Sequence, residues 1–327
     1  MKIRKILAAA GFAALFATAA QAQTCSLAQM ASLDMTMLPD GTFAVPVTIN
    51  GGQHLFRVDT SAIFTTLSDI AAQKLGLKQY AIDRLELYDV NGKMHITYID
   101  ADSFKVGNNE AKHFHLMVSP LGPNLPAEVD GRLGPDMLSL FDVELDFAAK
   151  KMNLFSQDHC PGKVVYWTKS GYAAVDFHMT SGRLNVTPHI AFQMTLDGRD
   201  LTTDLSTESD TTWIRKKSAL QIFGLDDNAP GLEHSPTVSE VGPLYRKRFE
   251  MLQLGGVAVQ HPMIDIVPDQ MDSSFKMAHS EKSRDDPIYG EGLKPEDLSL
   301  GMNVLSKLHL YIAYKEHKIY ATAADAH

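Results

Sequence analysis

The chain has 327 residues and a formal net charge of −9 at pH 7, so it is long enough for one large or two medium-sized domains with a buried core. This acidic excess argues against a nucleic-acid-binding protein, which needs clustered lysine and arginine. Beyond the N-terminus, no apolar run is long enough to cross a membrane. We therefore expect neither a nucleic-acid partner nor an integral membrane span.

The N-terminus has the features of a secretory signal peptide. A short stretch with three positive residues precedes an apolar run at residues 6–20, and Ala20-Gln21-Ala22 fits a small-x-small cleavage site. We predict that residues 1–22 are removed. The mature protein would then be exported to the periplasm or the cell exterior.

The chain contains two cysteines, Cys25 and Cys160, both in the part predicted to be exported. In an oxidising compartment we expect a disulfide between them, with free thiols as the alternative. A catalytic or metal-binding cysteine is disfavoured because neither belongs to a CxxC motif. We therefore do not interpret His159, which precedes Cys160, as half of a Cys/His dyad.

The first half reads as short strands joined by tight turns. In chain order, we expect a hairpin of strands at 43–49 and 54–58, a helix at 70–75, a hairpin within 85–106, a strand at 114–118, a short helix from Pro135, and strands at 141–147 and 152–155. Asn50-Gly51 predicts a hairpin turn because both residues tolerate positive φ. Ser68 and Gly76 suit the two ends of the helix. Strict alternation over 141–147 predicts a half-buried strand.

The second half repeats this pattern. At an offset of 147 residues, Asn50-Gly51 aligns with Asp197-Gly198 and Asp59 aligns with Ser206; at an offset of 167, Leu133-Gly134 aligns with Leu300-Gly301. We assign the 20-residue difference to the polar stretch 270–297, expected to be a surface loop. Self-similarity in one order predicts an internal duplication into halves 23–165 and 166–327.

The repeated unit resembles a lobe of the retropepsin-like aspartic peptidases, in their bacterial two-repeat form. The matching segments are Asp59-Thr60-Ser61-Ala62 with Thr65 and Leu133-Gly134-Pro135-Asp136-Met137-Leu138 in the first half, and Leu205-Ser206-Thr207-Glu208-Ser209 with Thr212 and Leu300-Gly301-Met302-Asn303-Val304-Leu305 in the second. The resemblance covers nearly all of the mature chain. It implies an all-β, two-lobed aspartic-protease-like fold, made of two homologous β-barrel-like lobes with a central cleft. The hairpin around Asn91-Gly92 would be the flap over that cleft.

The family's chemistry needs one aspartate from each lobe. Two adjacent carboxyl groups cannot both ionise, so one acts as a base toward a bound water and the other holds a proton. Here the first half supplies Asp59, but Ser206 stands at the equivalent position. The expected active-site turn residues are Thr60, Ser61, Ala62, Ser206, Thr207 and Glu208. Of these, the resemblance implies that Thr60 and Thr207 cross-brace the two turns, while Ser61 and Glu208 occupy positions where the motif has glycine.

Two acids are candidate replacements for the missing aspartate. Asp204 precedes Ser206 by two residues and Glu208 follows it by two, and neither assignment follows from the motif. The sequence thus supports two hypotheses. One is a peptidase that cleaves peptide bonds through an activated water with Asp59 as its surviving catalytic carboxylate. The other is an inactive pseudo-protease that binds peptides or acts as a scaffold.

We expect no cofactor and no metal. His113 and His115 alternate on a predicted strand. We interpret them as exposed strand residues, because no further ligand has suitable spacing.

Overall fold

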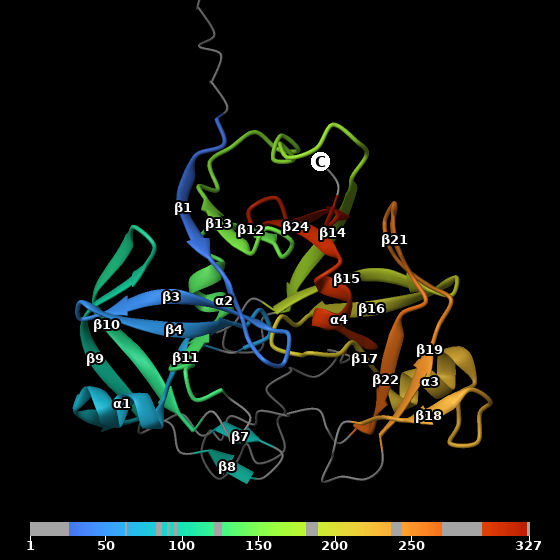
Figure 1. Ribbon diagram of the computed structural model, residues 1–327, viewed down its shortest axis with the longest axis horizontal. Helices are drawn as coiled ribbons and strands as arrows, with labels where there is room; N and C mark the ends of the chain where they lie inside the picture. Colours follow the sequence, from blue (N-terminus) through green and yellow to red (C-terminus); the bar gives the residue numbers. More distant parts are fainter. Residues whose placement is uncertain are drawn as a thin grey trace, which may run out of the picture.

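The computed structural model describes residues 26–62, 64–82, 87–89, 92–94, 97–120, 126–180, 189–236, 244–269 and 296–325. These residues are mostly β-strand, with four short helices among them. They form two lobes, left and right in Figure 1, joined by a sheet across the top. The all-β, two-lobed fold predicted from the sequence is confirmed.

The first lobe is a closed barrel. Its strands, in order around the barrel, are β3 (Phe43–Ile49), β4 (Gly52–Val58), β11 (Gly131–Leu133), β5 (Thr66–Ser68), β10 (Asn109–Ser119) and β9 (Thr97–Val106). β9 closes the barrel by pairing with β3, while β2 (Thr36–Met37) and β6 (Gln79–Ala81) extend it. Buried aromatic side chains, such as Phe56 packed edge-on against Phe104, fill the interior.

Local turn chemistry positions these elements as predicted. Asn50 and Gly51 have φ angles of 49° and 86° in the turn between β3 and β4. Helix α1 (Asp69–Leu75) begins after Ser68, whose hydroxyl accepts a hydrogen bond from the amide of Ala71, and ends at Gly76 with φ 63°. β7 (Leu87–Asp89) pairs with β8 (Gly92–Met94) where the flap hairpin is expected, although Asn91 lies outside the described residues.

The second lobe contains a similar succession of strands and helices along the chain. The strands are β15 (His189–Leu196), β16 (Arg199–Leu205), β17 (Trp213–Arg215), β18 (Leu232–His234), β19 (Tyr245–Arg248), β20 (Met251–Leu254), β21 (Val257–Gln260), β22 (Met263–Val267) and β23 (Leu298–Leu300), with helices α3 (Lys216–Phe223) and α4 (Met302–Leu305). Most of the loop predicted at 270–297 lies outside the described residues.

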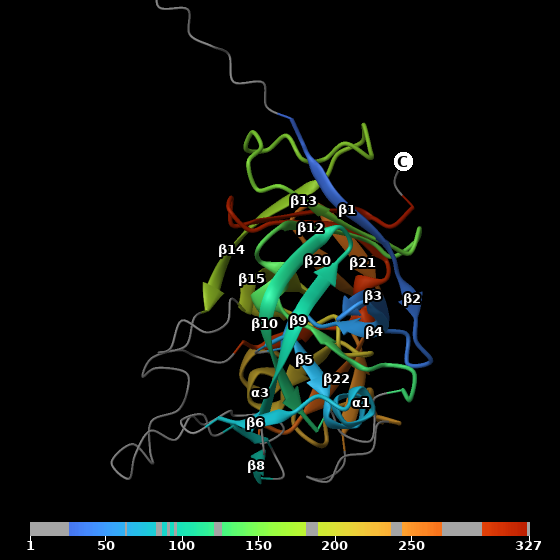
Figure 2. The same ribbon diagram turned by 90° about the vertical axis from the view of Figure 1, so that its left-hand side faces the viewer.

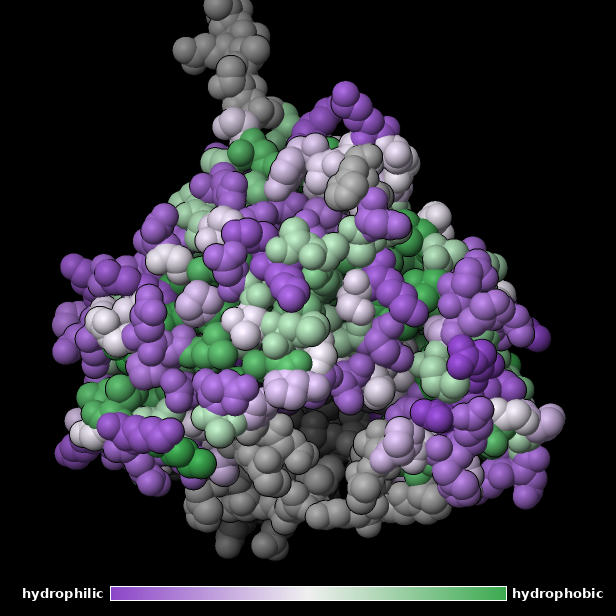
Figure 3. Space-filling model, in the orientation of Figure 1, coloured by the Kyte–Doolittle hydropathy of each residue, from purple (hydrophilic) through white to green (hydrophobic). Residues whose placement is uncertain are grey.

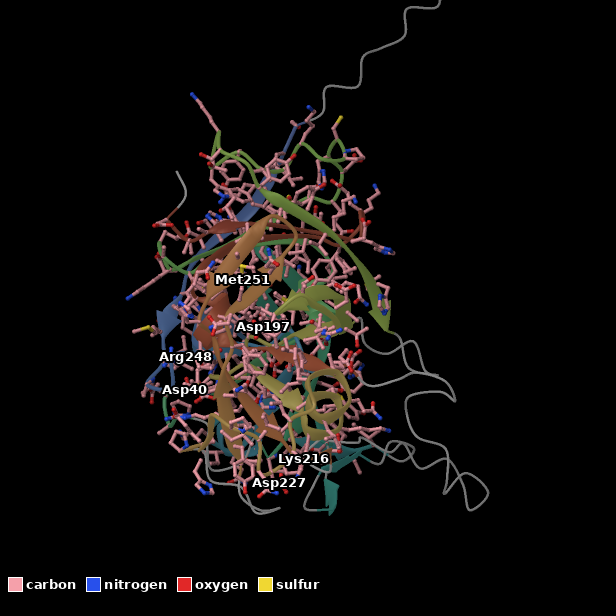
Figure 4. All side chains as sticks on the ribbon, turned by 90° about the vertical axis from the view of Figure 1, so that its right-hand side faces the viewer. Asp40, Asp197, Lys216, Asp227, Arg248 and Met251 are labelled. Atoms are coloured by element: carbon pink, nitrogen blue, oxygen red, sulfur yellow. The ribbon has the colours of Figure 1, made fainter. Side chains whose placement is uncertain are left out.

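The hairpin turns of the two lobes match. Asp197 and Gly198, with φ angles of 46° and 74°, repeat the conformation of Asn50 and Gly51. Each turn also holds a neighbouring strand with its side chain. Asn50 Oδ1 accepts a hydrogen bond from the amide of Ser103 at 3.0 Å, and Asp197 Oδ1 accepts one from the amide of Met251 at 2.8 Å (Figure 4).

Six strands at one end of a 15-stranded sheet join the lobes, and the sheet continues from the last of them into β15 of the second lobe. Their order is β1 (Gln29–Asp34), β13 (Lys151–Phe155), β12 (Asp142–Asp146), β24 (Leu308–Ala313), β25 (Lys318–Ala323) and β14 (Ala173–Thr180), and they lie at the top of Figures 1 and 2. The central strands, β12 and β24, come from different halves of the chain and pair antiparallel, with Val143 opposite Ile312.

The prediction that the strand over 141–147 is half-buried was wrong. Asp142, Val143, Glu144 and Leu145 are all buried, so β12 is covered on both faces. The segment after β13 supplies the second cover: the Tyr166 hydroxyl donates to Glu144 at 2.7 Å, and the Trp167 ring stacks on His309 at 4.2 Å. Alternation within the strand cannot reveal this cover because it comes from residues outside the strand, beyond β13.

Cys160 lies in the same covering segment and is disulfide-bonded. Cys25, its predicted partner, lies outside the described residues.

Hydrophilic residues line the edges of the face in Figure 3, and apolar residues gather toward its middle. Lys216, at the start of α3, is partly exposed and pairs with Asp227 (Figure 4), while His113 and His115 are exposed on β10. Among the described residues, no helix is long and apolar enough to cross a membrane, and no cluster of histidine, cysteine and acidic residues could hold a metal.

Candidate active site

Two equivalent turns face each other between the lobes. Asp59 follows β4 and Ser206 follows β16, and each is held by the strand beside it. The amide of Asp59 donates to the carbonyl of Leu133 at 3.0 Å, and the amide of Ser206 donates to the carbonyl of Leu300 at 3.1 Å. The alignment of Asp59 with Ser206 is therefore also a structural equivalence.

Thr60 and Thr207 tie these turns together. The Thr60 hydroxyl donates to the carbonyl of Leu205 at 2.6 Å and accepts from the amide of Thr207 at 3.1 Å. In the mirror arrangement, the Thr207 hydroxyl donates to the carbonyl of Val58 at 2.7 Å and accepts from the amide of Thr60 at 3.1 Å. Both threonines are buried, so four hydrogen bonds fix the relative position of the turns.

A second threonine in each lobe supports its turn from behind. Thr65 donates through its amide and hydroxyl to Asp136 Oδ1 at 2.8 and 2.7 Å, and Thr212 donates in the same way to Asn303 Oδ1 at 2.8 and 2.7 Å. An amide oxygen thus replaces a carboxylate oxygen with no change of geometry. Burial raises the pKa of Asp136, and the hydrogen bonds with Thr65 lower it by less, so that the pKa stays above its usual range.

A close approach of two backbone segments explains why each lobe has glycine in its Leu-Gly pair. A β-carbon on Gly134 would lie 2.7 Å from the carbonyl carbon of Phe64, and one on Gly301 would lie 2.2 Å from the carbonyl oxygen of Thr211. Only glycine allows the two backbone segments to approach so closely.

Asp59 is completely buried where the two turns meet. Its Oδ1 accepts hydrogen bonds from both the amide and the hydroxyl of Ser61, each at 3.0 Å. The Ser61 hydroxyl also lies 3.0 Å from the Ser206 hydroxyl. Ser206 therefore contacts the carboxyl group of Asp59 only through Ser61.

Glu208 reaches the position that Ser206 does not fill. Its Oε1 lies 2.5 Å from Nη2 of Arg132, and its side chain is close enough to Asp59 to shift the pKa of that carboxyl group. Nη1 of the same arginine lies 3.9 Å from Asp59 Oδ2. Two carboxyl groups and one guanidinium thus meet at the centre of the site.

The two carboxyl groups have displaced pKa values in opposite directions. Burial raises the pKa of Asp59, but the hydrogen bond with Glu208, the charge of Arg132 and the hydrogen bonds from Ser61 outweigh burial and leave it below its usual range. Burial and the charge of Asp59 raise the pKa of Glu208 well above its usual range, against the charge of Arg132. Such a split is typical of a pair that shares one proton.

Asp204, the other candidate replacement, points elsewhere. Its carboxylate accepts a hydrogen bond from the Ser299 hydroxyl at 3.1 Å, on the neighbouring strand β23. Burial and the charge of Glu296 raise its pKa to about 7.

The positions where the motif has glycine do not need it here. Ser61 and Glu208, both of which the structure describes, are not among the residues with positive φ. Their backbones therefore take conformations open to any residue, and Ala62 follows as a half-buried turn residue.

Sequence reasoning missed Arg132. It lies on β11 directly opposite Arg57 of β4, in the register that places Ser299 opposite Asp204 in the second lobe. Arg132 could have been found from its position two residues before Gly134 of the motif, because residues two apart on a strand point to the same face of the sheet. That position does not tell which partner a long side chain reaches.

Comparison with known proteins agrees with this geometry. A search of curated proteins found no significant match. Residues 45–137, which run from β3 through the Leu-Gly segment into α2 (Pro135–Leu138), match the family model described as aspartyl protease. The first lobe, with Asp59 in its turn, is thus similar to an aspartyl protease unit over residues 45–137.

Proposed function

We propose that this protein hydrolyses peptide bonds, with Asp59 as a catalytic carboxylate that activates a water molecule. The main support for this proposal is the pair of turns, joined by the hydrogen bonds of Thr60 and Thr207, that hold Asp59 at the junction of the lobes. The pKa of Asp59 lies below its usual range, so this carboxylate stays ionised in mildly acidic solution and can accept a proton from water. Thr60, Thr207 and Ser61 hold it in place.

A second candidate function rests on a separate observation. Ser206 occupies the partner position, and the Asp59 side chain is fully covered. Both features fit a pseudo-protease that keeps the interlobe site for peptide binding or as a scaffold.

Hydrolysis of an unfolded protein, such as reduced and alkylated lysozyme, separates the two. Protein purified from cells that express the full chain is assayed from pH 3 to 7, beside an Asp59→Asn variant and the exposed-site control Asp100→Asn. Our proposal predicts cleavage by the wild type and the control and a loss of about 10²–10⁴-fold in Asp59→Asn. Cleavage that persists unchanged in Asp59→Asn contradicts it. Peptide binding without cleavage favours the second candidate.

We also propose that the protein is exported after loss of residues 1–22. The disulfide at Cys160 supports this because such bonds persist in oxidising compartments. N-terminal sequencing of the purified protein tests the proposal: a chain that begins at Gln23 agrees with it, and one that begins at residue 1 does not.

A duplication that produced halves 23–165 and 166–327 is a further proposal. The equivalent hydrogen bonds of Thr65 and Thr212, and of Thr60 and Thr207, support it.

A further inference from the structure

We propose that Glu208 supplies the second catalytic carboxyl group, the one that holds the proton, in place of the aspartate that Ser206 replaces. This inference rests on the proposed peptidase function. It gives the second lobe a chemical role that the aligned residue cannot perform, since a serine hydroxyl neither carries charge nor shares a proton in the pH range of carboxyl groups.

The hydrogen bonds around Asp59 identify the proton. Oδ1 already accepts two bonds from Ser61, whereas Oδ2 is buried and has no hydrogen-bond partner. Arg132 holds Glu208 beside Asp59, because its guanidinium lies 2.5 Å from Oε1 of Glu208 and 3.9 Å from Oδ2 of Asp59. Two carboxyl groups can bond to each other only if one of them carries a proton. A proton on Glu208 directed to Oδ2 therefore satisfies a buried oxygen that would otherwise lack a partner.

Charge and exposure assign the proton to Glu208 and not to Asp59. The two donors from Ser61 stabilise the ionised form of Asp59. Arg132 contacts Oε1 of Glu208 at 2.5 Å, which leaves Oε2 to carry the proton. One shared negative charge then balances one guanidinium. The Glu208 side chain is 27% exposed and Asp59 is 0% exposed, so the group that donates to substrate is the one solvent can reach.

In the proposed reaction, Asp59 and Glu208 together hold one proton at the start and one proton at the end. Asp59 takes a proton from the attacking water while Glu208 gives its proton to the oxygen of the peptide carbonyl, which produces a tetrahedral diol. As the carbon–nitrogen bond breaks, Asp59 returns its proton to the leaving nitrogen and Glu208 recovers one from a diol hydroxyl. The products are a free carboxyl and a free amine, and the pair again holds one proton.

Glu208→Gln tests this directly. The glutamine amide can still donate a hydrogen bond to Asp59, so the turn keeps its support, but it has no proton to transfer. We expect kcat/KM for the unfolded protein to fall about 10²–10⁴-fold. The matched control is Glu233→Gln at an exposed glutamate on β18, expected within a few-fold of wild type. Asp204→Asn tests the rival acid and is also expected within a few-fold.

A titration that does not depend on turnover provides the second readout. Carboxyl-carbon NMR of protein purified from cells that express the full chain follows the titration of Glu208 in the wild type and in Asp59→Asn. Because the charge of Asp59 helps to raise the pKa of Glu208, we expect that pKa to fall toward its ordinary value in the variant. An unchanged Glu208 titration overturns the inference.

The outcomes also separate the inference from the proposed function. If the wild type does not cleave, or if Asp59→Asn cleaves as well as wild type, both fail. If Asp59 is required but Glu208→Gln equals wild type, the peptidase proposal stands and the role of Glu208 is overturned. A large loss in Asp204→Asn with none in Glu208→Gln transfers that role to Asp204.

Discussion

Arg132 sets the charge balance of the site. Its guanidinium lies 2.5 Å from the Glu208 carboxyl group and 3.9 Å from that of Asp59, and its charge lowers the pKa of both, against burial. No other side chain in the described part of the chain forms an ion pair with both. The arginine therefore decides at which pH the site can hold one negative charge.

Replacing Arg132 should move the pH profile in a defined direction. In Arg132→Gln the pKa of Asp59 rises, so Asp59 becomes protonated at a higher pH and loses its role as base. We expect the acid limb of the kcat/KM profile to shift to higher pH. The control is Arg246→Gln, which removes an exposed arginine paired with Glu233. An acid limb that stays in place in Arg132→Gln contradicts this account of the charge.

The role of Asp136 can be tested by replacing it with asparagine, the residue at the equivalent position of the second lobe. Asn303 makes the same two hydrogen bonds with Thr212 that Asp136 makes with Thr65, so Asp136→Asn should preserve the geometry. Burial raises the pKa of Asp136, so the folded state binds its proton more tightly than the unfolded state. The stability from that proton is complete below about pH 4 and is lost as pH rises through the folded pKa.

We therefore expect Asp136→Asn to lie within about 1 kcal/mol of wild type at pH 4 and to gain relative stability as the pH rises. Urea unfolding of both proteins from pH 4 to 7 measures this difference. A difference that grows in favour of the wild type would show that ionised Asp136 stabilises the fold.

At the scale of elements, the paired turns act as one unit because two threonines exchange hydrogen bonds. In Thr207→Val, the shape is kept, but the carbonyl of Val58 and the amide of Thr60 lose their buried partner. Each unpaired buried group costs roughly 1–3 kcal/mol.

We expect Thr207→Val to lower the free energy of unfolding by about 2–6 kcal/mol without changing the m-value in urea. The control, Thr195→Val, removes an exposed hydroxyl bond to Asp200 and should stay within about 0.5 kcal/mol. Equal stability of the two variants would mean that the brace contributes nothing to the junction.

The sequence predicts elements well where the signal is local. The Asn50-Gly51 turn, the Ser68 cap and Gly76 each act within a few residues, and each has its expected conformation. β12 was misjudged because residues from beyond β13 cover its outer face. In the site, the threonine brace follows from the motif, whereas the reach of Arg132 and Glu208 depends on rotamers set by the opposite lobe.

At the scale of the whole molecule, the shared sheet couples the lobes. Glu144 on β12 accepts hydrogen bonds from His309 on β24, Asn153 on β13 and Tyr166, at 2.9, 2.6 and 2.7 Å. Since β12 and β24 belong to different halves, this buried network cannot persist in one half alone. The two lobes should unfold together.

Unfolding in urea tests this coupling. Both tryptophans, Trp167 and Trp213, follow the first lobe in the chain, so fluorescence reports on the shared sheet and second lobe, and far-UV circular dichroism on both lobes. We expect coincident transitions. Glu144→Leu should shift both midpoints together, with a loss of roughly 1–3 kcal/mol for each buried group that loses its acceptor. Separate transitions would show that the lobes are independent.

The pH dependence of kcat/KM tests most directly whether Asp59 and Glu208 share one catalytic proton. We predict a bell-shaped profile for the wild type, whose acid limb reports loss of the single negative charge and whose alkaline limb reports loss of the shared proton. In Asp59→Asn and Glu208→Gln, activity should fall to a low level across the range. A wild-type profile with no alkaline limb, or a Glu208→Gln profile that matches wild type, would contradict the account.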